Sequence, residues 1–179
     1  MMLDTMLRDP NLPLPAAMVA DGWRDTVVAV LTAPNKTAVA MVCSAKDPTG
    51  QAITFVQGGM HDQEVSFGSA RREVREEIPS LKRKFRHEAF RVQWEQGLYL
   101  GSAAIKHTRS GVPKRLHFLV FPANRWSLVP DGKECSDAFW VHDPYSFKSM
   151  LAPTKEQNPD KYDAMCAAAF AAQQHGYLL

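Results

Sequence analysis

The stretch that decides the fold is GGMHDQEVSFGSARREVREE, which runs from Gly58 to Glu77. Its later part carries apolar residues at steps of three and four, the period of one helix face, and this predicts a helix over residues 66–78. Pro79 ends that helix, because proline disfavours helical geometry at the residue before it. The apolar positions are Phe67, Ala70, Val74 and Ile78.

A second helix face carries three carboxylates. Glu73, Glu76 and Glu77 stand at positions i, i+3 and i+4, so their side chains project together. Like charges this close repel each other, and a plain solvated helix is better served by alternating signs. Clustered carboxylates suit hard divalent cations, which prefer oxygen ligands. The pair Gly58-Gly59 permits a tight loop whose backbone N–H groups can approach phosphate oxygens.

The spacing of these residues resembles the signature of the Nudix hydrolases. Gly58 is followed after five residues by Glu64, and after seven more by Arg72-Glu73-Val74-Arg75-Glu76-Glu77. The resemblance implies an α/β/α sandwich with a central mixed sheet. It also implies hydrolysis of a diphosphate linkage with Mg²⁺ or Mn²⁺ bound by Glu73, Glu76 and Glu77. In this family the matching Arg72 orients the glutamates, and Glu64 helps to fix the loop.

The chain departs from the family pattern just after the glutamates. Ile78-Pro79-Ser80 stands where the family has a variable residue, glycine and an apolar residue. Proline cannot adopt the left-handed conformation of a glycine C-cap. We therefore expect a different helix exit, with the glutamates left in place because they precede it.

Other site residues are predicted downstream. Glu134 precedes an expected strand, and together with Phe139-Trp140-Val141 it resembles the end of the domain in bacterial RNA pyrophosphohydrolases. We expect Glu134 to be a further metal ligand, although a lone glutamate in such a turn is often only solvated. Lys114 and Arg115 begin a strand and are candidates for phosphate contacts, or else the charged end of a hairpin.

The sequence indicates the substrate less clearly than it indicates the reaction. Residues 55–60, Phe-Val-Gln-Gly-Gly-Met, resemble the Phe-Pro-Gln-Gly-Gly-Ile run of diadenosine polyphosphate hydrolases and bacterial RNA pyrophosphohydrolases, with Val56 in place of proline. Gln57 favours a dinucleoside polyphosphate or the 5′-triphosphate end of RNA. Nucleoside triphosphates, nucleotide sugars, ADP-ribose and coenzyme A stay open, as does a non-catalytic nucleotide-binding module.

The rest of the chain predicts a sheet covered by helices. Residues 1–22 are expected to be a proline-containing lead-in, and residues 23–179 one domain with a C-terminal helical extension. An alanine-rich run at 164–172 indicates close helix packing, for which a homodimer is one explanation. Expected strands cover 23–32, 37–44, 53–56, 89–94, 98–105, 116–121 and 138–142, and expected late helices cover 144–151 and 160–174.

Composition excludes several classes of function. The net charge is +2 over 179 residues, so the whole chain has no strong electrostatic preference for nucleic acids or membranes. Three cysteines without a CxxC pair do not support a disulfide framework or a cysteine zinc site. No apolar run approaches the length of a membrane span. We therefore expect a cytoplasmic enzyme that does not associate with membranes.

Overall fold

A computed structural model describes most of the chain. The two expected site segments around residues 58 and 134 are included, whereas Glu64, Pro79 and nearly all of the lead-in lie outside the described residues. None of the helices in this part combines the length and hydrophobicity that a membrane crossing requires. The described residues are 3, 22–46, 53–61, 65–78, 92–106, 108, 111–124 and 127–179.

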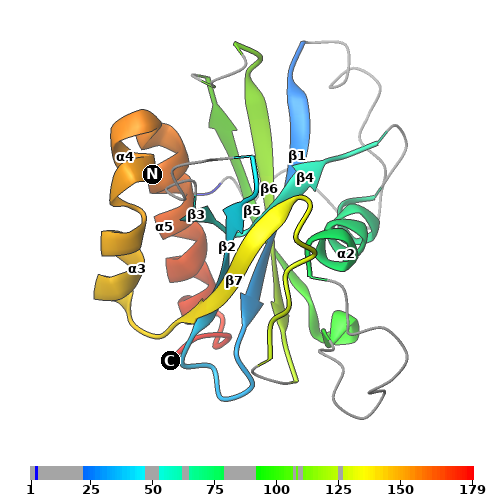
Figure 1. Cartoon of the computed structure of the whole chain (residues 1–179), viewed down its shortest axis with the longest axis vertical. Coiled ribbons are helices and arrows are strands. Elements are labelled where there is room, and N and C mark those ends of the chain that lie inside the picture. Colours follow the sequence, from blue (N-terminus) through cyan, green and yellow to red (C-terminus); the bar gives the residue numbers. More distant parts are fainter. Residues whose placement is uncertain are drawn as a thin grey trace.

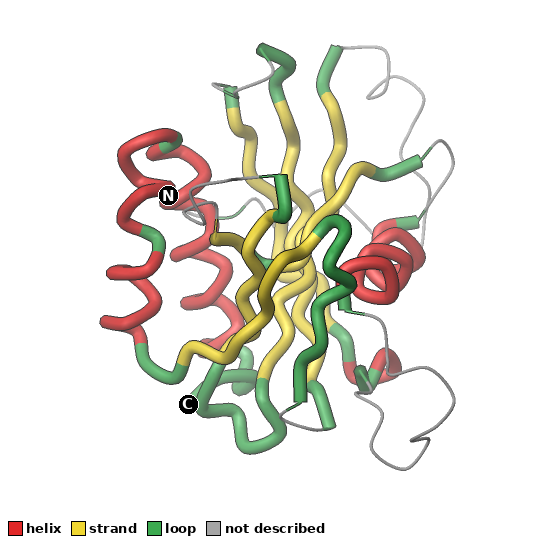
Figure 2. Tube along the Cα trace, in the orientation of Figure 1, coloured by secondary structure: helices red, strands yellow, loops and turns green. Residues whose placement is uncertain are grey.

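A mixed sheet forms the middle layer, with α2 on one face and α3, α4 and α5 on the other (Figures 1 and 2). This arrangement confirms the expected α/β/α sandwich. The strands are β1 (Arg24–Thr32), β2 (Val39–Ser44), β3 (Ile53–Thr54), β4 (Val56–Gly59), β5 (Leu98–Ile105), β6 (Lys114–Pro122) and β7 (Cys135–Val141). The helices are α2 (Ser66–Glu77), α3 (Pro144–Met150), α4 (Ala152–Gln157) and α5 (Pro159–Gln174), with a 3₁₀ turn η1 at Trp94–Gln96.

Strand β1 organises the sheet. One of its edges pairs in parallel with β6 along the whole strand, from Arg24 opposite Lys114 to Thr32 opposite Pro122. Two strands share the other edge: β4 pairs with residues 26–29 and β2 pairs only at Thr32. The sheet therefore divides at this edge, and β4 passes beneath α2. The glycine pair is thereby placed next to the acidic helix.

Two apolar clusters hold the layers together, one on each face of the sheet. Alternate residues of β1 face opposite sides, so Val27 packs toward α2 and Val28 toward α5. The fully buried residues Ala164, Ala168 and Ala172 recur every four residues along α5 and pack against the sheet. The alanine stripe thus serves packing within the chain, and the homodimer stays a prediction.

Several expected elements differ in detail. Residues 92–94 were expected to end a strand, but Val92 makes only an isolated bridge to Ala123 and Trp94 begins η1. Strand β7 begins at Cys135 rather than at residue 138. Helix α4 was not expected. Pro153 lies in its first turn, where proline is tolerated because its missing N–H would have no partner within the helix.

Candidate active site

Gly58 leaves room for the carboxylate of Glu73. Gly58 pairs with Val27 and therefore faces α2. A Cβ atom at this position would lie 1.9 Å from Cδ of Glu73, far closer than atoms can approach. Glu73 is 5% exposed, so its side chain has little space to move aside. The glycine that opens the motif is needed because the first glutamate of the helix packs directly on it.

Arg72 ties the helix to the glycine strand. Its Nη1 donates to Oε1 of Glu73 at 2.5 Å and to Oε2 of Glu76 at 3.2 Å. Its Nη2 donates to the backbone carbonyl of Gly59 at 2.7 Å. One guanidinium therefore orients two carboxylates and fixes their distance from β4. Burial raises the pKa of Glu73, and the charge and hydrogen bond of Arg72 lower it in part.

Glu134 lies across from Glu73 and Glu76, in a turn whose shape is held by Asp131. The Asp131 carboxylate accepts hydrogen bonds from the backbone N–H groups of Lys133, Glu134 and Cys135. Burial raises the pKa of Asp131, but these N–H groups lower it by more, so the net shift is downward. The turn is also hydrogen-bonded to the end of α2, because the Asp131 N–H donates to the carbonyl of Glu77 at 3.0 Å.

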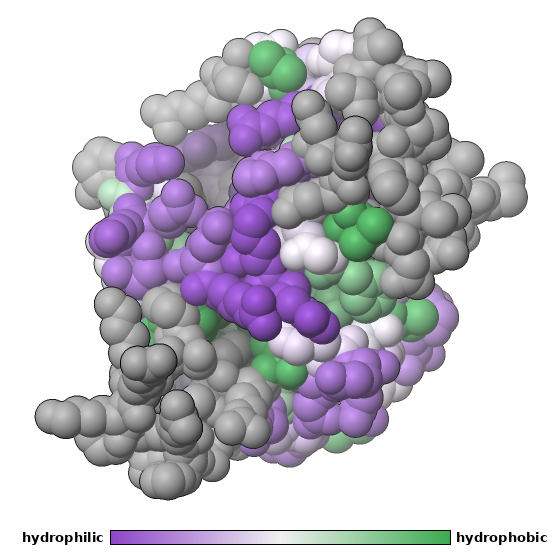
Figure 3. Space-filling model, turned by 90° about the vertical axis from the view of Figure 1, so that its right-hand side faces the viewer, coloured by the Kyte–Doolittle hydropathy of each residue, from purple (hydrophilic) through white to green (hydrophobic). Residues whose placement is uncertain are grey.

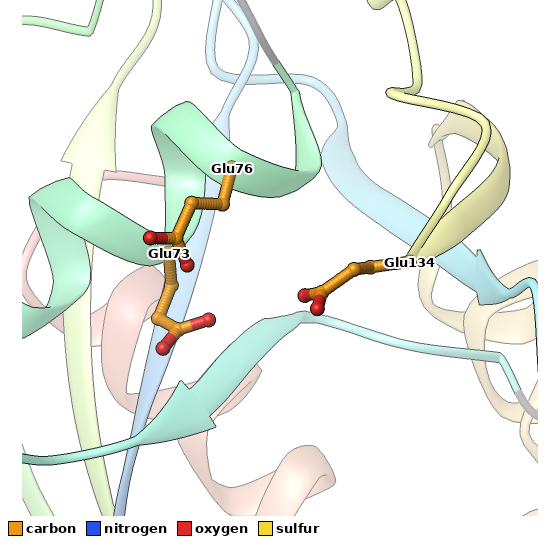
Figure 4. Close-up of side chains that lie close together, drawn as sticks. All are labelled: Glu73, Glu76 and Glu134. Carbon is orange, nitrogen blue, oxygen red and sulfur yellow. The ribbon is translucent and has the colours of Figure 1, made fainter.

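The three carboxylates of Glu73, Glu76 and Glu134 converge (Figure 4). Each offers an oxygen that lies within 4.8 Å of the other two. Glu73 is buried, whereas Glu76 and Glu134 are exposed, so the group opens to solvent. Hydrophilic side chains gather at the centre of the face that carries α2 (Figure 3). An all-oxygen group of this size and charge suits a hard divalent cation.

Glu77 is placed differently from its two neighbours. Its side chain is 7% exposed, and Oε2 accepts a hydrogen bond from Sγ of Cys135 at 3.3 Å. The backbone of Gln57 also hydrogen-bonds to this carboxylate. Burial raises the pKa of Glu77 to about 7, with smaller contributions from the charges of Glu73 and Glu134. The metal role expected for Glu77 stays a prediction, since its carboxylate lies outside the converging group.

Lys114 and Arg115 are brought to different faces of the sheet. Consecutive strand residues point to opposite sides, and Arg115 shares the α2 side with Asp25, to which it forms an ion pair at 3.6 Å. Lys114 faces α5. Only Arg115 therefore lies on the side of the carboxylates, and the substrate-binding role expected for both residues stays a prediction.

Asp25, the partner of Arg115, also belongs to a row of hydrogen-bonded polar side chains that the sequence did not indicate. Nε2 of His117, which is 1% exposed, lies 2.6 Å from Oδ1 of Asp25. The hydroxyl of Tyr99 lies 3.0 Å from Nδ1 of the same histidine. Strand alternation could not predict this row of side chains, because the pairing of β1 with β6 brings together residues that are far apart in the sequence. A sequence signal did exist for the Asp131 turn, where Asp-Gly is typical of turns.

A family model named NUDIX domain matches residues 22–158. Among solved structures, a NUDIX hydrolase from Nitrosomonas europaea is 16% identical with a TM-score of 0.56, over 84% of this chain and 90% of that one. An Ap4A hydrolase from C. elegans is 14% identical with a TM-score of 0.53, over 86% and 98%. The NUDIX domain of Shewanella oneidensis NrtR, solved with ADP ribose, is 13% identical with a TM-score of 0.58, over 90% and 93%. No curated protein matches the chain.

The match to the family model covers most of the chain, and the similar solved structures share its fold. The chain belongs to the Nudix family. It is a pyrophosphohydrolase that acts on pyrophosphate bonds of nucleotide substrates with the aid of divalent metal ions. The solved structures, at these identities, support the fold alone.

Proposed function

We propose that the protein hydrolyses a phosphoanhydride bond in a dinucleoside polyphosphate or at the 5′-triphosphate end of RNA. The convergence of Glu73, Glu76 and Glu134 is the observation that carries the hydrolytic part. The Gln57-Gly58-Gly59 lead-in supports the substrate, and a structural neighbour is named as an Ap4A hydrolase. Another neighbour is solved with ADP ribose, which makes ADP-ribose the second candidate.

The residues of the chain fit Mg²⁺ or Mn²⁺. Glu73, Glu76 and Glu134 would hold the ion, and Arg72 keeps the first two oriented toward it. When bound, such an ion polarises phosphoryl oxygens and lowers the pKa of bound water. We expect Gly58 and Gly59 to let the phosphates approach the backbone of β4. Arg115 adds a positive charge on the same side of the sheet as the carboxylates. Glu64 is proposed to fix the loop before the helix, outside the described residues.

The test is a panel of phosphoanhydrides incubated with Mg²⁺ or Mn²⁺, with every product identified. The panel contains diadenosine tetraphosphate, 5′-triphosphate RNA, ADP-ribose, a nucleotide sugar and nucleoside triphosphates. We expect the first two to be cleaved with the highest kcat/KM. Faster cleavage of ADP-ribose would replace the proposed substrate, and no cleavage of any compound would contradict the hydrolase assignment.

Glu134→Gln tests the downstream ligand. A group that acts mainly in the transition state affects kcat more than KM, so we expect a large fall in kcat and little change in unfolding. The matched control is Asp137→Asn, which alters an exposed acid in the same part of the chain. An unchanged kcat in the Glu134 variant would remove this residue from the site.

A further inference from the structure

Three cations gather at one end of the sheet, on the face opposite the carboxylates. Arg24 begins β1, Lys114 begins β6 opposite it in register, and Lys161 lies in the first turn of α5. The starts of these three elements lie at the same end of the molecule (Figure 1). Strand alternation points Arg24 and Lys114 toward the layer that contains α5.

The charge of Arg24 acts on Lys114, and the charge of Lys114 acts on Lys161. Burial lowers the pKa of Lys114, and the charge of Arg24 lowers it further. Burial likewise lowers the pKa of Lys161, to about 8, and the charge of Lys114 adds to this shift. The charge of Glu77 opposes that shift, but it is the weakest of the three influences on Lys161. The two lysines are half-buried, so water screens their repulsion incompletely.

No carboxylate in the described part of the chain forms an ion pair with these three cations. Asp25, which pairs with Arg115, faces the other side of the sheet. Cations held together without a paired acid are unfavourable in the free protein, above all when they are half-buried, as Lys114 and Lys161 are. An anion bound among them would relieve this repulsion.

Gly59 connects this cluster to the carboxylate group. The guanidinium of Arg24 lies against the glycine: a Cβ atom there would be 2.7 Å from its Nη2. The carbonyl of the same glycine accepts the hydrogen bond from Arg72. The cations and the carboxylates therefore lie on opposite sides of a single extended strand.

We propose that Arg24, Lys114 and Lys161 form a binding site for phosphate oxyanions on the α5 face of the sheet. The anion is either the phosphate chain of the substrate, bound beyond the linkage that is cleaved, or a free phosphate. The first source rests on the proposed function, whereas anion binding itself does not. Three convergent cations favour a phosphate over a carboxylate ligand, because a phosphate offers more oxygens and more charge.

The first experiment measures anion binding without metal. Inorganic pyrophosphate is titrated calorimetrically into the full chain in EDTA, and thermal unfolding is followed with and without pyrophosphate. We expect wild-type protein to bind and to gain Tm. Lys161→Met should bind at least ten-fold more weakly, whereas Lys161→Arg should retain binding. Lys46→Met, on an exposed lysine, is the matched control and should behave as wild type.

Thermal unfolding separates a binding role from a structural one. Without anion, Lys161→Met should unfold at the wild-type Tm or above it, because one repelling charge is gone. A lower Tm would indicate that Lys161 stabilises the fold, and would contradict the proposal. Absence of pyrophosphate binding by wild type, or equal binding by Lys161→Met, would also overturn it. These outcomes do not depend on hydrolysis, so they are distinct from failure of the proposed function.

Kinetics then distinguish the two sources of phosphate, using the best substrate of the panel. If the substrate chain occupies the site, Lys161→Met raises KM and inorganic pyrophosphate inhibits the wild type competitively. If a free anion occupies it, pyrophosphate changes kcat of the wild type and leaves Lys161→Met unaffected. Both results uphold the site and identify its occupant. Kinetics of Lys161→Met identical to wild type, with pyrophosphate present or absent, would contradict it.

Discussion

The two neighbouring glycines of β4 impose different limits on substitution. Gly58→Ala would place a methyl group inside the buried carboxylate of Glu73, whereas Gly59→Ala would meet only the flexible end of Arg24. We expect Gly58→Ala to lose most metal binding and activity, and Gly59→Ala to keep a substantial part of both. Calorimetric titration with Mn²⁺ and steady-state kinetics of the two variants test this. Equal losses in the two variants would show that the position of Glu73 does not decide the outcome.

The raised pKa of Glu77 predicts that the stability of the metal-free protein depends on pH. Its pKa rises from the ordinary 4.5 to about 7 on folding, because burial disfavours the charged form. Between these values the folded protein holds a proton that the unfolded chain has released. Stability is therefore greatest below pH 4.5 as far as Glu77 is concerned, and it falls as pH rises toward 7, by up to about 1.4 kcal/mol per unit.

Urea unfolding in EDTA, measured from pH 4.5 to 8, tests this dependence. Glu77→Gln removes the titrating group and should flatten the decline, leaving the smaller contribution of Glu73, whose pKa is also raised. If the variant follows the wild-type curve, Glu77 is not the source of the decline.

At the scale of elements, the acidic site is assembled from a helix and a turn. Asp131 receives three backbone N–H groups and thereby directs Glu134 toward α2. We expect Asp131→Ala to lower kcat several-fold, in the manner of Glu134→Gln, because the turn loses its shape. Asp131→Asn keeps one acceptor oxygen and should retain more activity. Steady-state kinetics at saturating Mg²⁺ compares the two, and wild-type kcat in Asp131→Ala would show that the turn holds itself without Asp131.

The described end of α2 is completed by a turn that is distant in the sequence. Ile78 closes α2 with a hydrogen bond to the carbonyl of Val74, and the Asp131 N–H binds the carbonyl of Glu77. A neighbouring turn thus satisfies a helix-end carbonyl that a glycine cap commonly serves. The different exit expected from Pro79 stays a prediction, and no local signal in the sequence points to Asp131 as the residue that binds the end of α2.

The same limit applies to the rest of the site. Helix periodicity was sufficient to predict α2 and its acidic face, because residues three and four apart are neighbours in any helix. Strand alternation puts Lys114 and Arg115 on opposite faces of the sheet, but it could not show which of the two faces the acidic site. That placement depends on the parallel register with β1, which no local signal encodes.

At the scale of the whole molecule, α5 is part of the helical layer that covers one face of the sheet. Ala168 is fully buried against the sheet, so Ala168→Leu should overpack this interface and lower the free energy of unfolding by about 1–3 kcal/mol. Ala167→Leu, at a half-buried position of the same helix, should cost less. Urea unfolding measures both, and sedimentation of the wild type tests the predicted homodimer. Equal unfolding free energies in the two variants would contradict the packing described for α5.

The parallel pairing of β1 with β6 also has a consequence for synthesis on the ribosome. β1 is among the earlier strands to be made, yet its full-length partner β6 follows only after α2 and β5. Pairing two strands that are separated by so long a segment is slow. Until β6 has been made, the apolar residues of β1 are exposed on that side. Glu134 emerges later still. The nascent protein therefore carries one edge of β1 without its partner until β6 is made, and its acidic site is incomplete until the turn before β7 has been synthesised.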